Sequence, residues 1–313
     1  MAVNLGLHLA ASGLVLYLAG PVAASLFAAH PMAADAVASV SGRSAELLAL
    51  SVLIGIAVYR RSKLAGAIVG AVAAVGSAAF TVGYFATIHG APGRWDYMRS
   101  LAASFPDILR KTAIPVGLSA EPVMAARGGG LEVLGWMLVA ALVALIFAKR
   151  IPSGVRIGAG LLILPLLPYF LIPLPNGFYE HRAYLSLAGA SILMAAALSK
   201  LPGAALVIAT AFLVMTDARV SAYASPVALW EDAVAKTPMN GRAHLNLGTY
   251  YALAGRINEA QQEYETVIRI APDIALGWKN LSNLHLWRGR VGSASEVLDA
   301  FDEYVKSKQK GRT

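Results

Sequence analysis

Pro173-Leu-Pro-Asn-Gly-Phe-Tyr-Glu-His-Arg-Ala-Tyr-Leu185 is a short polar stretch between two long apolar runs, and the organisation of the chain follows from it. Both flanks of this stretch are almost entirely apolar. They are residues 157–174, which overlap its beginning, and residues 185–198, which follow from its last residue. The ionisable residues 180–182 therefore lie where a membrane helix begins again. Ionisable residues at such a boundary are either interfacial anchors or functional groups. We favour function here, because the three residues combine an acid, a titratable base and a permanent cation.

The composition indicates an integral membrane protein with several spanning helices. Hydrophobic residues make up 57% of the 313 residues and charged residues 14%, which fits a polytopic membrane protein better than a soluble domain. The net charge of +8 requires no nucleic-acid partner, because lysine and arginine beside membrane helices account for such an excess. The chain contains no cysteine, which excludes disulfides and cysteine-ligated metals. No basic segment precedes the first apolar run, so we expect that run to stay in the membrane uncleaved.

Seven apolar runs approach or exceed the length of about 18 residues that a helix needs to cross a bilayer. They are residues 4–29, 46–59, 64–88, 131–148, 157–174, 184–198 and 201–216. Gly20-Pro21 interrupts the first run. Because proline kinks a helix by removing a backbone donor, we predict one long bent helix there rather than a cramped hairpin. Pro165, Pro168 and Pro173 predict an irregular fifth span.

Basic residues in the short loops predict the orientation of the chain in the membrane. Residues 60–63, 149–156 and 200 fall on one side, which the positive-inside rule makes the cytoplasm. The amino terminus then lies in the cytoplasm and the tail after residue 216 lies outside, and we expect a bacterial inner membrane. The outer side also receives the loops that carry mixed charges, at residues 30–43, 89–130 and 176–182.

One of these outer loops has a helical pattern of its own. Within residues 94–114, apolar side chains recur at helical spacing with charged side chains between them, which predicts an amphipathic helix in the membrane interface. Such a helix either covers the bundle or provides a platform for a lipid-linked substrate.

After residue 225 the chain becomes more polar and shows a repeat near 34 residues, the period of tetratricopeptide (TPR) helix pairs. Residues 241–274 and 275–308 are two copies, and residues 225–240 resemble the second helix of a preceding unit. We therefore predict an all-α protein with a membrane helix bundle over residues 1–217 and an extracytoplasmic TPR domain over residues 218–313.

The predicted TPR domain has a concave surface of the kind that binds a peptide or protein partner. The candidate partner-binding residues are Asn246, Tyr250, Asn280, Asn283 and His285. An ordinary solvent-facing role would explain these residues equally well.

Several motifs follow one another in a fixed order along nearly the whole chain. They are Asn4-Leu-Gly-Leu-His8, His30-Pro31, Asp35-Ala-Val37, Ser41-Gly-Arg43, Glu46-Leu-Leu48, Pro115-Val-Gly-Leu118, Glu180-His-Arg-Ala-Tyr-Leu185 and residues 217–237 with Arg219 and Leu229-Trp230. In this order they resemble motifs of the transmembrane-and-TPR (TMTC-type) O-mannosyltransferases and their bacterial relatives, within the GT-C glycosyltransferase superfamily. Ser186 stands where that family usually has proline.

The resemblance implies a GT-C-like bundle in which a polyprenyl-phosphate sugar donor enters from the membrane. The sugar then passes to a hydroxyl group on the extracytoplasmic side, and the repeats hold the acceptor. Arg182 and Arg43 are candidates for the donor phosphate, since arginine suits bidentate phosphate contacts. His181 or His30 would donate to that phosphate or orient it, and Tyr184 completes the candidate substrate-binding residues.

Acidic residues are the candidates for catalysis. Glu180 would hold Arg182 or His181 in place, and Glu180 and Asp35 are the two catalytic candidates. For Asp35 and Glu46 we favour a structural role, because acids stabilise the amino-terminal ends of helices. Some GT-C enzymes use a divalent cation, but the sequence shows no convincing ligand cluster, so no metal site is assigned.

The chain departs from the family at its beginning. In the family the catalytic acids lie in the first extracytoplasmic loop, after a first membrane helix, and this chain begins at the helix that follows. We therefore expect a shortened product, catalysis that depends on another subunit, or lost catalysis. The alternative is a non-catalytic membrane scaffold or accessory subunit that binds a partner protein through its repeats. A transporter fits less well, because no pair of broken helices occupies matching halves of the chain.

Overall fold

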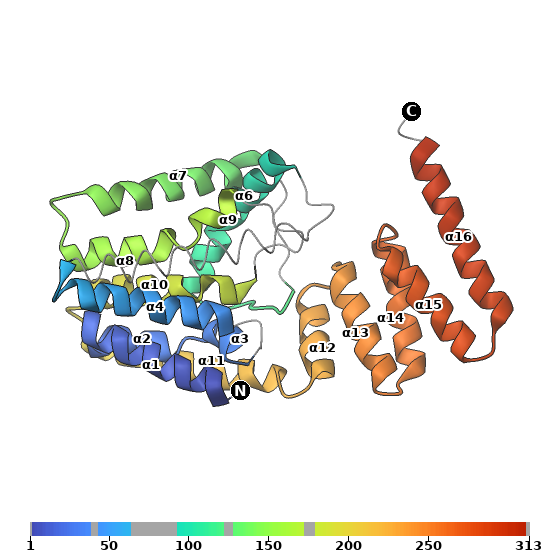
Figure 1. Ribbon diagram of the computed structural model, residues 1–313, viewed down its shortest axis with the longest axis horizontal. Coiled ribbons are helices and arrows are strands. Elements are labelled where there is room, and N and C mark those ends of the chain that lie inside the picture. Colours follow the sequence, from blue (N-terminus) through green and yellow to red (C-terminus); the bar gives the residue numbers. More distant parts are fainter. Residues whose placement is uncertain (1, 39–42, 64–92, 122–127, 172–178, 311–313) are drawn as a thin grey trace. The chain divides into compact units, whose positions relative to one another are not determined.

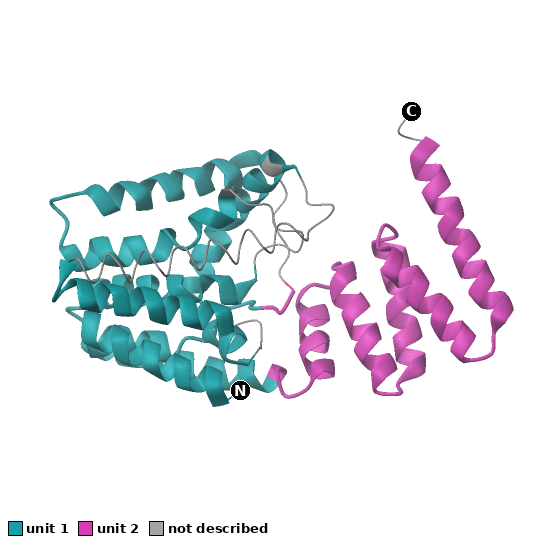
Figure 2. Ribbon diagram, viewed as in Figure 1, with its two compact units in different colours: residues 1–118, 124–221 teal, residues 119–123, 222–313 magenta. Residues whose placement is uncertain are grey.

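A computed structural model describes residues 2–38, 43–63, 93–121, 128–171 and 179–310 (Figure 1). Every regular element in these ranges is a helix, which confirms the predicted all-α class. The chain divides into two compact units (Figure 2). Unit 1 comprises residues 1–118 and 124–221, and unit 2 comprises residues 119–123 and 222–313. The predicted span at residues 64–88 lies outside the described residues.

The first apolar run is a helical hairpin, so the prediction of one bent helix was wrong. Helices α1 (Ala2–Ala19) and α2 (Pro21–Ala28) pack against each other. Gly20 between them has φ 87° and ψ 177°, a backbone conformation that essentially only glycine adopts and that is not helical. The Nε2–H of His8 donates to the carbonyl of Ala28 at 3.2 Å and so joins the two helices.

The rest of unit 1 follows most of the predicted spans. Its helices are α3 (Ala33–Ala38), α4 (Arg43–Tyr59), α6 (Arg94–Ala113), α7 (Gly129–Phe147), α8 (Ser153–Ile163), α9 (Leu167–Leu171), η1 (Glu180–Ala183), α10 (Tyr184–Ala197) and α11 (Pro202–Ala222). Within the described ranges, four segments are long and apolar enough to cross a membrane: Ala2–Ala19, Gly129–Phe147, Ser153–Phe170 and Pro202–Ala222. These segments support the prediction of a membrane protein. The break between α8 and α9 agrees with the irregular fifth span.

Small residues let the helices of unit 1 approach closely. A Cβ atom added to Gly189 on α10 would lie 2.3 Å from the backbone nitrogen of Leu162 on α8. One added to Gly135 on α7 would lie 1.8 Å from the carbonyl oxygen of Ala102 on α6. Membrane helices commonly associate through such small residues, because lipid provides no hydrophobic drive for helix association.

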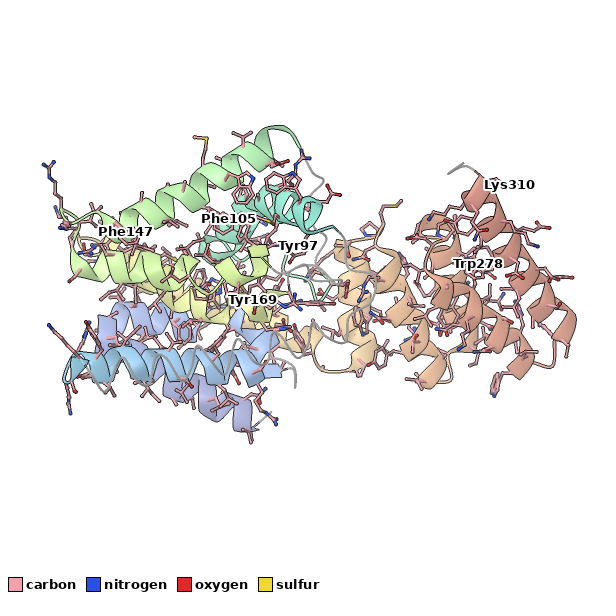
Figure 3. The ribbon with its side chains drawn as sticks, turned by 45° about the horizontal axis from the view of Figure 1, so that its top comes forward. Tyr97, Phe105, Phe147, Tyr169, Trp278 and Lys310 are labelled. Carbon is pink, nitrogen blue, oxygen red and sulfur yellow. The ribbon has the colours of Figure 1, made fainter. Side chains whose placement is uncertain are left out.

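Helix α6 confirms the predicted amphipathic helix and shows how its apolar face is used. Tyr97 and Phe105 (labelled in Figure 3) are buried, as is Leu101. The ring of Phe105 contacts that of Phe170 on α9 with 5.9 Å between centroids. Trp95, at the start of α6, is 64% exposed. The buried face is therefore used to cover the bundle.

Unit 2 is a succession of antiparallel helices. They are α12 (Pro226–Lys236), α13 (Gly241–Leu253), α14 (Ile257–Ile270), α15 (Ala275–Trp287) and α16 (Val291–Lys310). Helix α15 begins 34 residues after α13, at the predicted period. The core of unit 2 consists of Leu247, Tyr251, Ala260, Tyr264, Leu281 and Leu284. Trp278 packs on Phe301 and donates its indole N–H to the carbonyl of Pro272 at 2.9 Å (Figure 3).

Two details of unit 2 were not predicted. Helix α11 continues past Asp217, so the boundary falls after residue 221 rather than after residue 217. A short segment around Glu121, which we had assigned to a loop of the bundle, belongs to unit 2. The carboxylate of Glu121 is buried and accepts a hydrogen bond from Nε of Arg242 at 2.8 Å.

His244 is a buried ionisable residue of unit 2, and both of its ring nitrogens have hydrogen-bond partners. Its Nδ1 lies 2.5 Å from a carboxylate oxygen of Glu263, and its Nε2 lies 2.9 Å from the carbonyl oxygen of Pro238. Both neighbours accept hydrogen bonds, so both ring nitrogens must donate, which only the protonated imidazole does. The hydrogen bond to Glu263 and that to Pro238 raise the pKa of His244 above its ordinary value of 6.5.

The close approach of α8 and α10 leads to a testable prediction. Gly189→Ala should destabilise unit 1 by about 1–3 kcal/mol, because the new methyl group overlaps the backbone of α8. Thermal aggregation of the detergent-solubilised chain measures this effect. Gly160→Ala on α8 is the matched control, since its Cβ would meet only Leu164 at 3.8 Å. Equal stability of the two variants would contradict the close contact.

The His244 contacts predict how the stability of unit 2 depends on pH. When folding raises the pKa of a histidine, the protonated histidine stabilises the folded state. This contribution is complete below the unfolded pKa of about 6.5 and is lost as the pH rises through the higher pKa of the folded state. The stability of unit 2 can be measured in the full chain by urea unfolding, with proteolytic cleavage within α13 and α14 as the readout. The free energy of unfolding should be lower at pH 9 than at pH 6. His244→Gln should flatten this difference, and an unchanged pH dependence in that variant would refute the assignment.

Candidate functional site

The 3₁₀ turn η1 places three consecutive ionisable side chains in three different environments. A 3₁₀ helix has three residues per turn, so the side chains of neighbouring residues point about 120° apart. Glu180 is buried, whereas His181 and Arg182 are partly exposed. We call Asp35, Tyr169, Tyr179, His181 and Arg182 the polar cluster.

His181 and Asp35 form a doubly hydrogen-bonded pair. The backbone N–H of His181 donates to Oδ2 of Asp35 at 3.0 Å, and the ring Nδ1–H donates to the same oxygen at 2.9 Å. The side chains are 16% and 13% exposed. These contacts fix the tautomer of a neutral His181 and leave its Nε2 as an acceptor. Within the described ranges Nε2 has no hydrogen-bond partner, so it is available to a ligand or an acceptor hydroxyl.

Arg182 lies against two aromatic rings. Its guanidinium carbon is 5.1 Å from the ring centroid of Tyr179 and 5.7 Å from that of Tyr169 on α9. Tyr169 is labelled in Figure 3. The ring of Tyr179 also stacks on that of His181, with 5.7 Å between centroids and an interplanar angle of 10°. Stacking of this kind restrains the planar guanidinium, and the planar group suits bidentate contact with an anion.

Glu180 pairs with a residue that sequence reasoning did not place in the site. A guanidinium nitrogen of Arg219 on α11 lies 3.3 Å from a carboxylate oxygen of Glu180, and both side chains are 4% exposed. We had expected Glu180 to hold Arg182 or His181. A signal for this pair was present in the sequence, since Arg219 is the one basic residue of the mostly apolar helix α11.

Tyr184 belongs to the interior of the bundle rather than to the polar cluster. It is 1% exposed, and its hydroxyl donates to Nδ1 of His8 at 2.6 Å. Its ring also packs on Phe27 with 5.4 Å between centroids. As a buried core residue, it cannot contact a substrate in this structure.

His30 is also not available as a substrate-binding residue. It is 1% exposed, its Nε2–H donates to the carbonyl of Thr112 at 3.1 Å, and its Nδ1 accepts the backbone N–H of Met32 at 3.2 Å. Burial lowers the pKa of His30 to about 4, so the ring is neutral at physiological pH. Both ring nitrogens of His30 are hydrogen-bonded, and the bond to Thr112 links the segment that precedes α3 with helix α6.

Arg43 and Glu46 lie in the first turn of α4. Nε of Arg43 donates to the side-chain oxygen of Asn4 at 3.0 Å, and the amide nitrogen of Asn4 donates to the carbonyl of Ala36 at 3.1 Å. Glu46 is fully buried, and neither of its carboxylate oxygens has a hydrogen-bond partner among the described residues. Its place in the first turn agrees with the predicted helix-end role, but its complete burial was not predicted.

The candidate partner-binding residues of unit 2 differ in how far they are exposed to solvent. Asn283 is exposed, and Asn246, Tyr250 and Asn280 are partly exposed. His285 is 8% exposed, so it does not belong to a binding surface. The reason is the repeat itself, because residue 285 lies 34 positions after the core residue Tyr251.

Comparisons with known proteins add no assignment to this geometry. No family model matches the chain, and neither a curated protein nor a solved structure matches it. Among the described residues, no group of three or more histidine or acidic side chains is placed to hold a metal ion.

The Glu180–Arg219 pair predicts that the main role of Glu180 is to stabilise the fold by neutralising Arg219. Glu180→Leu should cost about 3–5 kcal/mol, because it leaves a buried guanidinium without its carboxylate. Adding Arg219→Met should recover most of the loss, since a buried ion pair can be replaced by apolar side chains of similar size. Thermal aggregation in detergent measures both variants. A double variant as unstable as Glu180→Leu alone would contradict this account.

Proposed function

We propose that the protein binds a polyprenyl-phosphate sugar at the polar cluster and transfers the sugar to a hydroxyl group of a polypeptide held by unit 2. The observation that carries the proposal is the placement of an arginine restrained by two tyrosines beside an aspartate-oriented histidine. The motif resemblance to TMTC-type O-mannosyltransferases supports the same reaction class. In this proposal unit 1 is a GT-C-like bundle, unit 2 is a TPR domain, and both the cluster and unit 2 lie on the extracytoplasmic side.

Each member of the cluster has a role in the proposed transfer. Arg182 neutralises the donor phosphate, and the rings of Tyr169 and Tyr179 keep its guanidinium in place. Nε2 of His181 accepts the proton of the acceptor hydroxyl as its oxygen bonds to the anomeric carbon. The bond from that carbon to the phosphate oxygen breaks, and the lipid phosphate leaves with the electron pair. Asp35 orients His181 and stabilises its protonated form, as a carboxylate does for a histidine base.

This assignment differs from our expectation from sequence, which named Glu180 and Asp35 as the catalytic candidates while favouring a structural role for Asp35. Asp35 is bonded twice to His181, so it acts through the histidine rather than on the substrate. Glu180 is also engaged, because it neutralises Arg219 in the interior. His181 is therefore our choice for the base.

A non-catalytic scaffold is the second candidate, and the helix-pair repeat of unit 2 favours it. Unit 2 has its own hydrophobic core, and Asn283 on α15 is exposed while Tyr250 on α13 is partly exposed. In that case the chain co-purifies with another protein under gentle extraction, and deletion of residues 222–313 removes that protein.

Donor binding and sugar transfer test the first proposal separately. Arg182→Ala should weaken binding of a short-chain polyprenyl-phosphate mannose by about 10- to 100-fold, the value of a charge-assisted hydrogen-bonding group. His181→Ala should leave that binding nearly unchanged and abolish transfer to an acceptor peptide. Arg110→Ala is the matched control, since Arg110 is an exposed arginine paired with Asp107 in the same unit.

Each result separates the two candidate functions. Unchanged donor binding in Arg182→Ala would refute the phosphate site. Donor binding without transfer by the unaltered chain, together with a co-purifying protein, would favour the scaffold.

A further inference from the structure

Two turns of unit 2 expose large apolar side chains at equivalent positions. Leu253 and Trp287, the last residues of α13 and α15, are 34 residues apart and are 76% and 74% exposed. Val291, which begins α16 after the second turn, is 67% exposed. The core of unit 2 does not use these side chains. We call residues 253–257 and 287–291 the turn edge.

The turn edge also carries arginines. Arg256 pairs with Glu259 and Glu231, so its charge is neutralised locally. Arg288 donates to the neutral side chains of Gln261 and Asn258 and therefore keeps its positive charge. Arg290 is exposed, and its guanidinium makes no hydrogen bond or ion pair with the described residues. The second turn thus combines an exposed tryptophan with two uncompensated cations.

The chain enters unit 2 at this same edge. Helices α12, α14 and α16 run in the same direction, so their amino-terminal ends lie along one edge of the unit (Figure 1). Three residues separate the end of α11 at Ala222 from the start of α12 at Pro226. Three extended residues span only about 10 Å. Helix α11 is a candidate membrane span, so a short linker joins the end of that helix to the first residue of α12, which lies on the same edge of unit 2 as the two turns.

We propose that the turn edge binds the surface of an anionic lipid bilayer. Tryptophan is enriched at membrane interfaces, where its ring lies at the level of the headgroups. Arginine beside such an apolar residue meets the phosphates of anionic lipids. The short linker supplies a high local concentration of this surface, so a small contact area suffices for binding. This inference needs α11 to span the bilayer and does not depend on the proposed sugar transfer.

A spin label tests the proposal in the full chain, because the protein has no cysteine of its own. Val291→Cys keeps Trp287, Leu253 and the arginines, and Leu276→Cys is the matched control. Leu276 is 55% exposed but lies near the start of α15, away from the turn edge. The protein is placed in nanodiscs that contain phosphatidylglycerol. The spin label at residue 291 should then collide more often with oxygen, which is enriched in lipid, than with a water-soluble nickel chelate. At residue 276 the order should be reversed.

Further variants identify the groups responsible. Adding Trp287→Ser should make residue 291 accessible to the nickel chelate. Arg288→Gln with Arg290→Gln, or nanodiscs of phosphatidylcholine alone, should reduce the preference for oxygen several-fold. Equal nickel accessibility at residues 291 and 276 would overturn the proposal. Protection of residue 291 from both reagents would overturn it too, because a polypeptide or a second copy of the chain would then cover the edge.

Discussion

The arrangement of the candidate site depends on one carboxylate oxygen that accepts two hydrogen bonds from the same residue. Oδ2 of Asp35 binds both the backbone N–H and the ring Nδ1–H of His181, so it fixes the position and the ring orientation of that residue together. Because η1 is a single tight turn, fixing His181 also fixes its two neighbours. Glu180 is then directed to Arg219, and Arg182 to the tyrosine rings. The pair joins α3 to η1 across 146 residues of sequence.

Polar side chains elsewhere in unit 1 fasten helices to one another where apolar packing gives little specificity. Asn4 and His8 on α1 bind the backbone carbonyls of Ala36 and Ala28, and the hydroxyl of Thr216 on α11 donates to the carbonyl of Ala29 at 2.7 Å. In lipid, an apolar helix surface gains nothing by leaving an equally apolar solvent, so close packing and such hydrogen bonds select the neighbours. Five of the buried polar residues of unit 1 are used in this way: Asn4, His8, His30, Glu180 and Arg219.

The sequence predicted the helix class, most of the spans and the 34-residue period, because hydrophobic patterning reports those features directly. It did not predict the hairpin at Gly20, because proline after glycine is compatible with both a kink and a reversal of the chain. For the site, the sequence identified Asp35, His181 and Arg182 but not the contacts between them. The pairing of Glu180 with Arg219 and the engagement of both nitrogens of His30 depend on which helices become neighbours, and a single sequence does not encode that in any local pattern.

The Glu180–Arg219 pair links the candidate site to the last turn of α11. Arg219 lies one turn from the end of α11, the helix that leads directly into unit 2. Because both charges are buried, separating them costs several kcal/mol, and the end of α11 is therefore held firmly against η1. A shift of α11 along its axis would break this pair and displace the turn that also carries His181 and Arg182. The positions of the polar cluster and of the end of α11 are thus set by the same buried ion pair.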